Sequence, residues 1–167
     1  MTDAAKFHGQ INQALYFARL LATHAHSIEQ AVGDAGQFNR QQAQCYCEAS
    51  LDALYRAFYF LAQSCCAQGV AASSAFIDPQ QWPERLAREQ QARPAPFLRE
   101  LLAGLQPGQT LAHMLAAYAA LWQVKSRRSS AAEISATEIR VAAADCRAWY
   151  DALTHLHARM QEQAAEF

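Results

Sequence analysis

Thiols are the side chains in this sequence best suited to chemistry, and four of the five cysteines lie at the two ends of one segment, residues 41–66 (QQAQCYCEASLDALYRAFYFLAQSCC). Thiolates bind zinc, and paired thiols can form disulfides. The segment reads as one helix, so Cys47 and Cys65, which are 18 residues apart, share a face but lie ~27 Å apart along the axis. A single zinc ion, with Zn–S bonds of ~2.3 Å, cannot join them.

The other cysteine spacings also argue against a metal or disulfide site. Cys45 and Cys47 project ~200° apart around a helix, and a disulfide between the adjacent Cys65 and Cys66 would be strained. The segment has no CxxC motif, and the one further cysteine in the chain is Cys146. We therefore expect buried thiols that pack in the core, with metal binding and redox sensing as alternatives. An odd number of cysteines fits a reducing compartment better than a disulfide framework.

Histidines form two HxH pairs, His24/His26 and His155/His157. If the first and last helices are antiparallel, His24 and His155 lie ~20 Å apart along the axis, so the pairs do not form one four-histidine site. We expect surface or partly buried histidines.

A smaller metal site is the alternative for the second pair. His8 lies nearer to His155 and His157 in this arrangement, with Asp3 and Asp151 close by. Imidazole and carboxylate groups together can hold a transition-metal ion. The sequence itself assigns no metal-ligating, cofactor-binding or catalytic residue.

Nuclease chemistry is a further alternative. Arg19-Leu-Leu-Ala-Thr-His24 has the Arg-x4-His spacing of the active-site motif in HEPN-type helical ribonucleases. In that family the motif lies towards the C-terminal helix, and a polar residue follows the arginine. Here the motif lies on the first predicted helix and Leu20 follows the arginine, which puts the activity in doubt. The sequence contains no Walker, HExxH or GxSxG pattern.

Composition indicates a helical chain rich in apolar surface. Apolar residues make up 52% and charged residues 17% of the 167 residues, against ~25% charged in average soluble domains. The net charge of −1 gives no global attraction to nucleic acid or to anionic membranes. The start of the chain lacks a basic segment followed by an apolar one, and no window approaches ~18 apolar residues. We therefore expect a cytoplasmic protein.

Apolar residues recur at helical spacing along most of the chain. Asp78-Pro79 and Pro96 can each open a short helix, because aspartate caps a helix and proline suits its first turn. Ser135-Ala136-Thr137-Glu138 reads as a capping box that opens the last helix. The predicted helices cover residues 3–30, 38–68, 96–105, 110–124 and a last stretch to about residue 163, with a flexible loop at 125–134.

This pattern predicts a single all-α domain over residues 1–167. Its architecture should be an up-down-up-down four-helix bundle with a broken third helix and an irregular second connection at 70–96. The second half of the second helix is apolar around much of its circumference, which favours a central position or a contact with a partner. The residues predicted to form an interface or pocket are Tyr55, Tyr59, Phe60, Tyr118 and Trp122.

Three runs give a resemblance to a known family: Asn12-Gln-Ala-Leu-Tyr-Phe-Ala18, Ala116-Ala-Tyr-Ala-Ala-Leu-Trp122, and Trp149 followed by Leu153. In this order they resemble a family of small all-helical bacterial proteins to which no activity is assigned. The resemblance implies a helical bacterial cytoplasmic protein and carries over no catalytic residue.

The leading hypothesis is a non-enzymatic interaction or structural protein that associates with itself or with a protein partner, and not with nucleic acid or membrane. The first alternative is a bundle that binds a small apolar ligand or a metal near Tyr55, Tyr118 and Trp122. The second is a HEPN-like ribonuclease.

Overall fold

The chain folds into helices throughout the parts that the computed structural model describes, which are residues 3–31, 36–66, 78–129 and 140–165. These ranges contain six α-helices and one short 3-10 helix, and no strand. The all-α prediction is confirmed, with six α-helices where four were expected. Their bounds are α1 Asp3–Ala31, α2 Gly36–Cys65, η1 Pro79–Gln81, α3 Trp82–Ala92, α4 Pro96–Gly104, α5 Thr110–Ser129 and α6 Ala143–Ala165.

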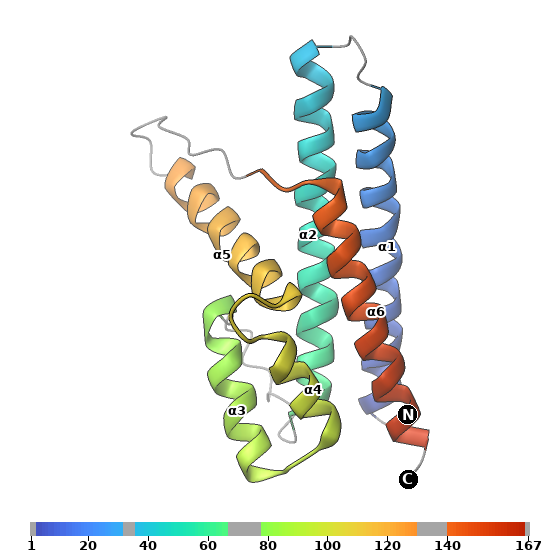
Figure 1. Ribbon diagram of the computed structural model, residues 1–167, viewed down its shortest axis with the longest axis vertical. Coiled ribbons are helices and arrows are strands. Elements are labelled where there is room, and N and C mark those ends of the chain that lie inside the picture. The colour runs from blue at the N-terminus through green and yellow to red at the C-terminus, as the bar shows by residue number, and fades with distance from the viewer. Residues whose placement is uncertain (1–2, 32–35, 67–77, 130–139, 166–167) are drawn as a thin grey trace.

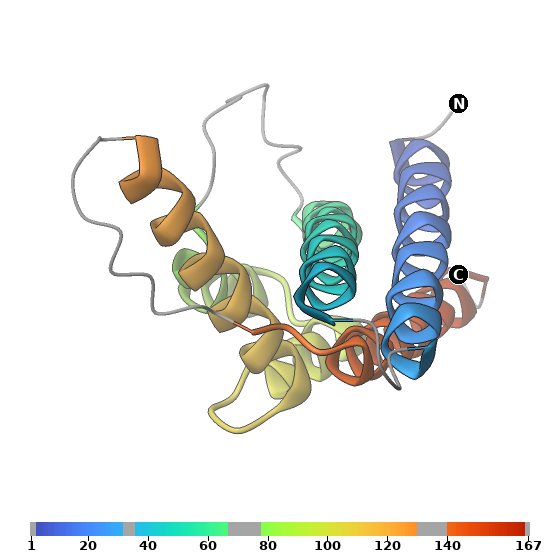
Figure 2. The same cartoon turned by 90° about the horizontal axis from the view of Figure 1, so that it is seen from above.

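Helices α1 and α2 form a long antiparallel hairpin, and α6 lies along one face of it (Figure 1). Viewed from above, α6 covers one side of the hairpin, and no other helix of the described residues lies on the opposite side (Figure 2). The core between the three helices contains Ile11 and Ala18 of α1, Leu54 of α2 and Leu153 of α6, all nearly fully buried. Apolar residues at helical spacing therefore put α1, α2 and α6 together, as the sequence pattern predicts.

The remaining helices form an arm beside α2, which we define as η1 with α3, α4 and α5. Its start matches the prediction: the Asp78 carboxylate accepts a hydrogen bond of 3.0 Å from the Gln80 backbone N–H, with Pro79 in the first turn. Trp82 follows at once and is fully buried. Its ring meets Phe58 of α2 edge-on, with centroids 5.7 Å apart. From residue 78 on, the connection expected to be irregular is thus fixed to the hairpin by an aromatic anchor. Residues 70–77 of that connection lie outside the described residues.

The two pieces expected for a broken third helix, 96–105 and 110–124, correspond to α4 and α5. α3 lies in the stretch 70–96, which was expected to be an irregular connection. α4 begins at Pro96 as predicted, and Gly108, at a φ of 84°, makes the turn before α5. Only glycine adopts this left-handed backbone conformation without strain. α5 lies obliquely to the hairpin (Figure 1).

Some helix ends differ from the predictions. α5 continues to Ser129, so residues 125–129 of the predicted loop are helical. α6 begins at Ala143, later than the predicted capping box, and its first turn carries Asp145, whose carboxylate accepts from the Ala142 backbone N–H at 3.2 Å. The capping box at 135–138, the rest of the predicted loop and the predicted end of the second helix near Gln68 lie outside the described residues.

Candidate interaction groove

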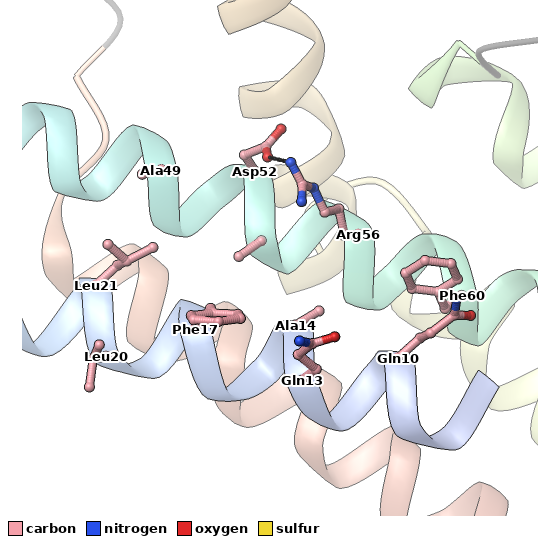
Figure 3. Close-up of a pocket in the computed structure, with 11 residues that line it drawn as sticks. Gln10, Gln13, Ala14, Phe17, Leu20, Leu21, Ala49, Asp52, Arg56 and Phe60 are labelled. Atoms are coloured by element: carbon pink, nitrogen blue, oxygen red, sulfur yellow. Dashed lines mark ion pairs between the residues drawn. The ribbon is translucent and has the colours of Figure 1, made fainter. Parts of the chain in front are cut away.

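A groove of about 490 Å³ runs along the face of the α1–α2 hairpin. One wall comes from α1 and the other from α2 (Figure 3). The wall residues recur every three or four positions on each helix, so each wall is one continuous stripe. The α1 stripe is Gln10, Gln13, Ala14, Phe17, Leu20 and Leu21, and the α2 stripe is Ala49, Asp52, Ala53, Arg56 and Phe60.

Large apolar side chains of α1 line or adjoin this groove while remaining open to solvent. Phe17 is 47% exposed and Leu20 is 53% exposed. The neighbouring Tyr16 is 55% exposed, and its ring meets Phe17 edge-on with centroids 5.8 Å apart. Single exposed apolar residues are ordinary on protein surfaces, but a contiguous group that lines a groove is typical of an interaction site.

Two polar features accompany the apolar walls. Asp52 and Arg56 form an ion pair of 2.9 Å at the α2 wall, and both side chains remain partly exposed. Gln10 extends beside Phe60 (Figure 3), and its carboxamide oxygen is buried without a hydrogen-bond partner among the described residues. A buried acceptor without a partner costs about 1–3 kcal/mol.

The residues predicted to form an interface or pocket separate into two places. Phe60 lines the groove. Tyr55 and Tyr118 stack on each other between α2 and α5, with ring centroids 3.9 Å apart and an interplanar angle of 12°. Tyr59 meets both Phe60 and the anchor Trp82 edge-on. The rings of Tyr55 and Tyr118 are in direct contact, so no ligand fits between them.

Hydrogen bonds fix this aromatic cluster. The Trp82 indole N–H donates to the Tyr55 hydroxyl at 3.1 Å, and the Tyr118 hydroxyl donates to the Asp52 carboxylate at 3.4 Å. Burial raises the pKa of Tyr118 to about 12 and also raises that of Tyr55. Both phenols therefore stay protonated at neutral pH. Trp122 continues the cluster towards solvent, 6.3 Å from Tyr118 and 44% exposed.

The cysteines fit the packing prediction only in part. Cys47, Cys66 and Cys146 are buried, while Cys65 is half-buried. Cys45 is exposed, so the expectation that all four thiols of the segment are buried was wrong. The cause is the ~200° between Cys45 and Cys47, which turns one outward when the other faces the core.

One histidine, His157, is more deeply buried than expected. His24 and His155 are exposed and His26 is half-buried, as predicted, but His157 is 5% exposed. Its ring lies against His8, as the antiparallel arrangement suggested, with nitrogen atoms 3.1 Å apart. Arg19 of the Arg-x4-His motif is exposed like His24, and His24 packs edge-on against Tyr46.

The α1 wall is the part of the groove that sequence reasoning missed. Gln10, Ala14, Phe17 and Leu21 are spaced by four, three and four residues. That spacing, with a phenylalanine and a leucine among them, is the signal that could have identified a second apolar face.

Comparison of the chain with models of protein families, with curated proteins and with solved structures found no match. The family resemblance therefore rests on the three sequence runs alone. Among the described helices, none is long and apolar enough to cross a membrane. Within the same residues, no group of three or more histidine, cysteine, aspartate or glutamate side chains is arranged to hold a metal ion.

Proposed function

We propose that this protein is a non-enzymatic helical interaction module that self-associates through the α1–α2 groove. The observation that carries the proposal is the solvent-exposed apolar wall of α1, with Phe17 and Leu20 facing a groove that ends at Phe60. Burying these side chains against a partner would be favourable by about 25 cal/mol for each Å² of apolar surface removed from water.

A second copy of the chain is the occupant that the groove fits best. A twofold axis between Asp52 and Arg56, which are one helical turn apart, brings the carboxylate of each copy towards the guanidinium of the other. One surface then supplies both charges of the contact. Two hairpins packed face to face would form a four-helix bundle of the type expected from the sequence, shared between two chains.

The proposed module works without chemistry of its own, and we place it in the cytoplasm, where its five free thiols stay reduced. Nucleic acid is not the proposed partner because the groove carries one carboxylate and one guanidinium, with no excess of positive charge.

The test is Phe17→Asp, which places a charge in the centre of the groove. Sedimentation velocity over a range of protein concentrations should show that the parent protein dimerises. In Phe17→Asp the dimer dissociation constant should rise about tenfold or more, since central aromatic residues dominate interface energies.

Phe38→Asp is the matched control. Phe38 is 75% exposed and does not line the groove, so the same substitution there should leave dimerisation unchanged. A parent protein that stays monomeric at every concentration would contradict the proposal. Equal weakening by Phe17→Asp and Phe38→Asp would also contradict it, because the contact would then not be specific to the groove.

A further inference from the structure

A polar cluster joins the first turns of α1 to the last turns of α6, away from the groove. His8 Nδ1 and His157 Nε2 lie 3.1 Å apart. The Gln161 amide nitrogen contacts His8 Nδ1 and lies 3.3 Å from His8 Nε2 and 3.4 Å from His157 Nε2. The Asn12 amide lies 2.9 Å from the other ring nitrogen of His8, Nε2. Three polar groups from two helices therefore converge on one point, and a fourth supports them from behind.

The donors and acceptors around His8 restrict which of its ring nitrogens carries the proton. A neutral imidazole has one N–H donor and one acceptor nitrogen, yet both ring nitrogens of His8 face an amide. The Asn12 amide can present its oxygen after a half-turn about its last bond, and His8 Nε2–H then donates to it. That arrangement leaves the lone pair of His8 Nδ1 directed at His157 Nε2 and Gln161. In metal sites a histidine ligand is oriented in the same way, by donating its second N–H to an oxygen.

We propose that His8 Nδ1 and His157 Nε2 bind one divalent ion of the late first transition row, such as Zn²⁺ or Ni²⁺, with Asn12 orienting His8. Gln161 adds its side-chain oxygen after a half-turn of its amide, which now presents its nitrogen to the rings. Imidazole is a preferred ligand of these ions. Two Zn–N bonds of ~2.0–2.1 Å at a tetrahedral angle place the nitrogens ~3.3 Å apart, close to the 3.1 Å between the two rings. A shift of a few tenths of an ångström brings the two imidazole nitrogens to this separation, and the Gln161 amide must also move away from His8 to admit the ion.

The ligands of the proposed site imply bound water and a modest affinity for the ion. The site contains two histidines and no carboxylate or thiolate within the described residues, so water completes the coordination. A bound ion would fasten α1 to α6 near the two ends of the chain.

Isothermal titration of the full-length protein with Zn²⁺ tests the proposal. The exposed Cys45 thiol is itself a zinc ligand, so the parent for these measurements is Cys45→Ser. We expect one saturable site with micromolar affinity for Zn²⁺ and none for Mg²⁺, which prefers oxygen ligands. His8→Ala should weaken binding of Zn²⁺ about tenfold or more, while His155→Ala, an exposed histidine on the same helix, should leave it unchanged.

Asn12→Ala keeps both imidazole ligands and changes an exposed side chain, so it separates loss of binding from loss of folding. It should weaken binding of Zn²⁺ roughly tenfold, as loss of an orienting partner does in known sites. Zn²⁺ should also raise the unfolding temperature of the parent and not that of His8→Ala. Absence of a saturable Zn²⁺ site in the parent, or equal affinity in the parent and His8→Ala, would overturn the proposal. Dimerisation is measured separately without metal, so either proposal can fail alone.

Discussion

At the scale of single residues, exposure divides the five thiols into one reactive and four protected groups. Cys45 is exposed, whereas burial raises the pKa of Cys65 to about 12 and also raises that of Cys66. The Cys146 thiol lies 3.6 Å from the Cys47 carbonyl oxygen, inside the core. We expect a disulfide-exchange reagent at pH 8 to modify one thiol rapidly in the native protein and five after denaturation. Cys45→Ser should remove the rapid phase, and a second rapid thiol would contradict this assignment.

The buried His157 should make stability depend on pH. Burial and the charge of His8 lower its pKa in the folded protein below the ordinary value of 6.5. Above pH 6.5 the group is neutral in both states, so it contributes no pH dependence there. As the pH falls below 6.5 the unfolded chain binds the proton first, and the free energy of unfolding decreases until the folded protein also becomes protonated. In metal-free buffer, urea titrations from pH 7.5 to 5 should show a shallower loss for His157→Gln than for the parent.

At the scale of elements, local signals located several helix starts but not that of α6, and long-range packing determined which faces are buried. Asp78-Pro79 and Pro96 open helices because capping and the restricted φ of proline act within a few residues. The deep burial of Trp82 was not predictable in this way, because it depends on contact with Phe58 in a distant helix. The exposure of Cys45 was also not predictable from local sequence. Helix geometry fixes the direction of Cys45 relative to Cys47, but the neighbouring helices determine which of the two directions is buried.

Two glycines should respond in opposite directions to the same substitution. Gly9 lies inside α1 with nothing within 4 Å of an added Cβ, so Gly9→Ala should stabilise the protein by about 0.5–1 kcal/mol. Gly108 has equal space, but its φ of 84° is unfavourable for alanine. Gly108→Ala should destabilise by about 1 kcal/mol. Equilibrium urea unfolding measures both, and a gain in stability for Gly108→Ala would show that this turn does not hold its left-handed conformation.

At the scale of the whole molecule, the described helices cover one face of the α1–α2 hairpin and not the other. α6 packs on one side of the α1–α2 hairpin, and the arm lies beside α2 through the contacts of Trp82 and the Tyr55–Tyr118 stack. The apolar circumference of α2 predicted contacts on several of its sides. Of the residues predicted to form an interface or pocket, Phe60 is one that lines the groove. The α1 wall of the groove could not be predicted from the sequence in the same way. Its position depends on how α1 and α2 are rotated about their axes, which is set by the packing of both helices.

If two hairpins pair as proposed, the charges at the groove should govern association. Arg56→Glu would place a second negative charge beside Asp52, so that like charges meet across the twofold axis and the dimer weakens. The matched control is Arg88→Glu. Arg88 also forms an ion pair with a carboxylate one helical turn earlier, that of Glu84, and both residues lie on the exposed surface of α3. Sedimentation at low and high salt should show weaker association for Arg56→Glu alone, with the difference reduced at high salt because salt screens exposed charges. Equal behaviour of the two variants would mean that the ion pair at the groove lies outside the contact, and the twofold arrangement would have to be abandoned.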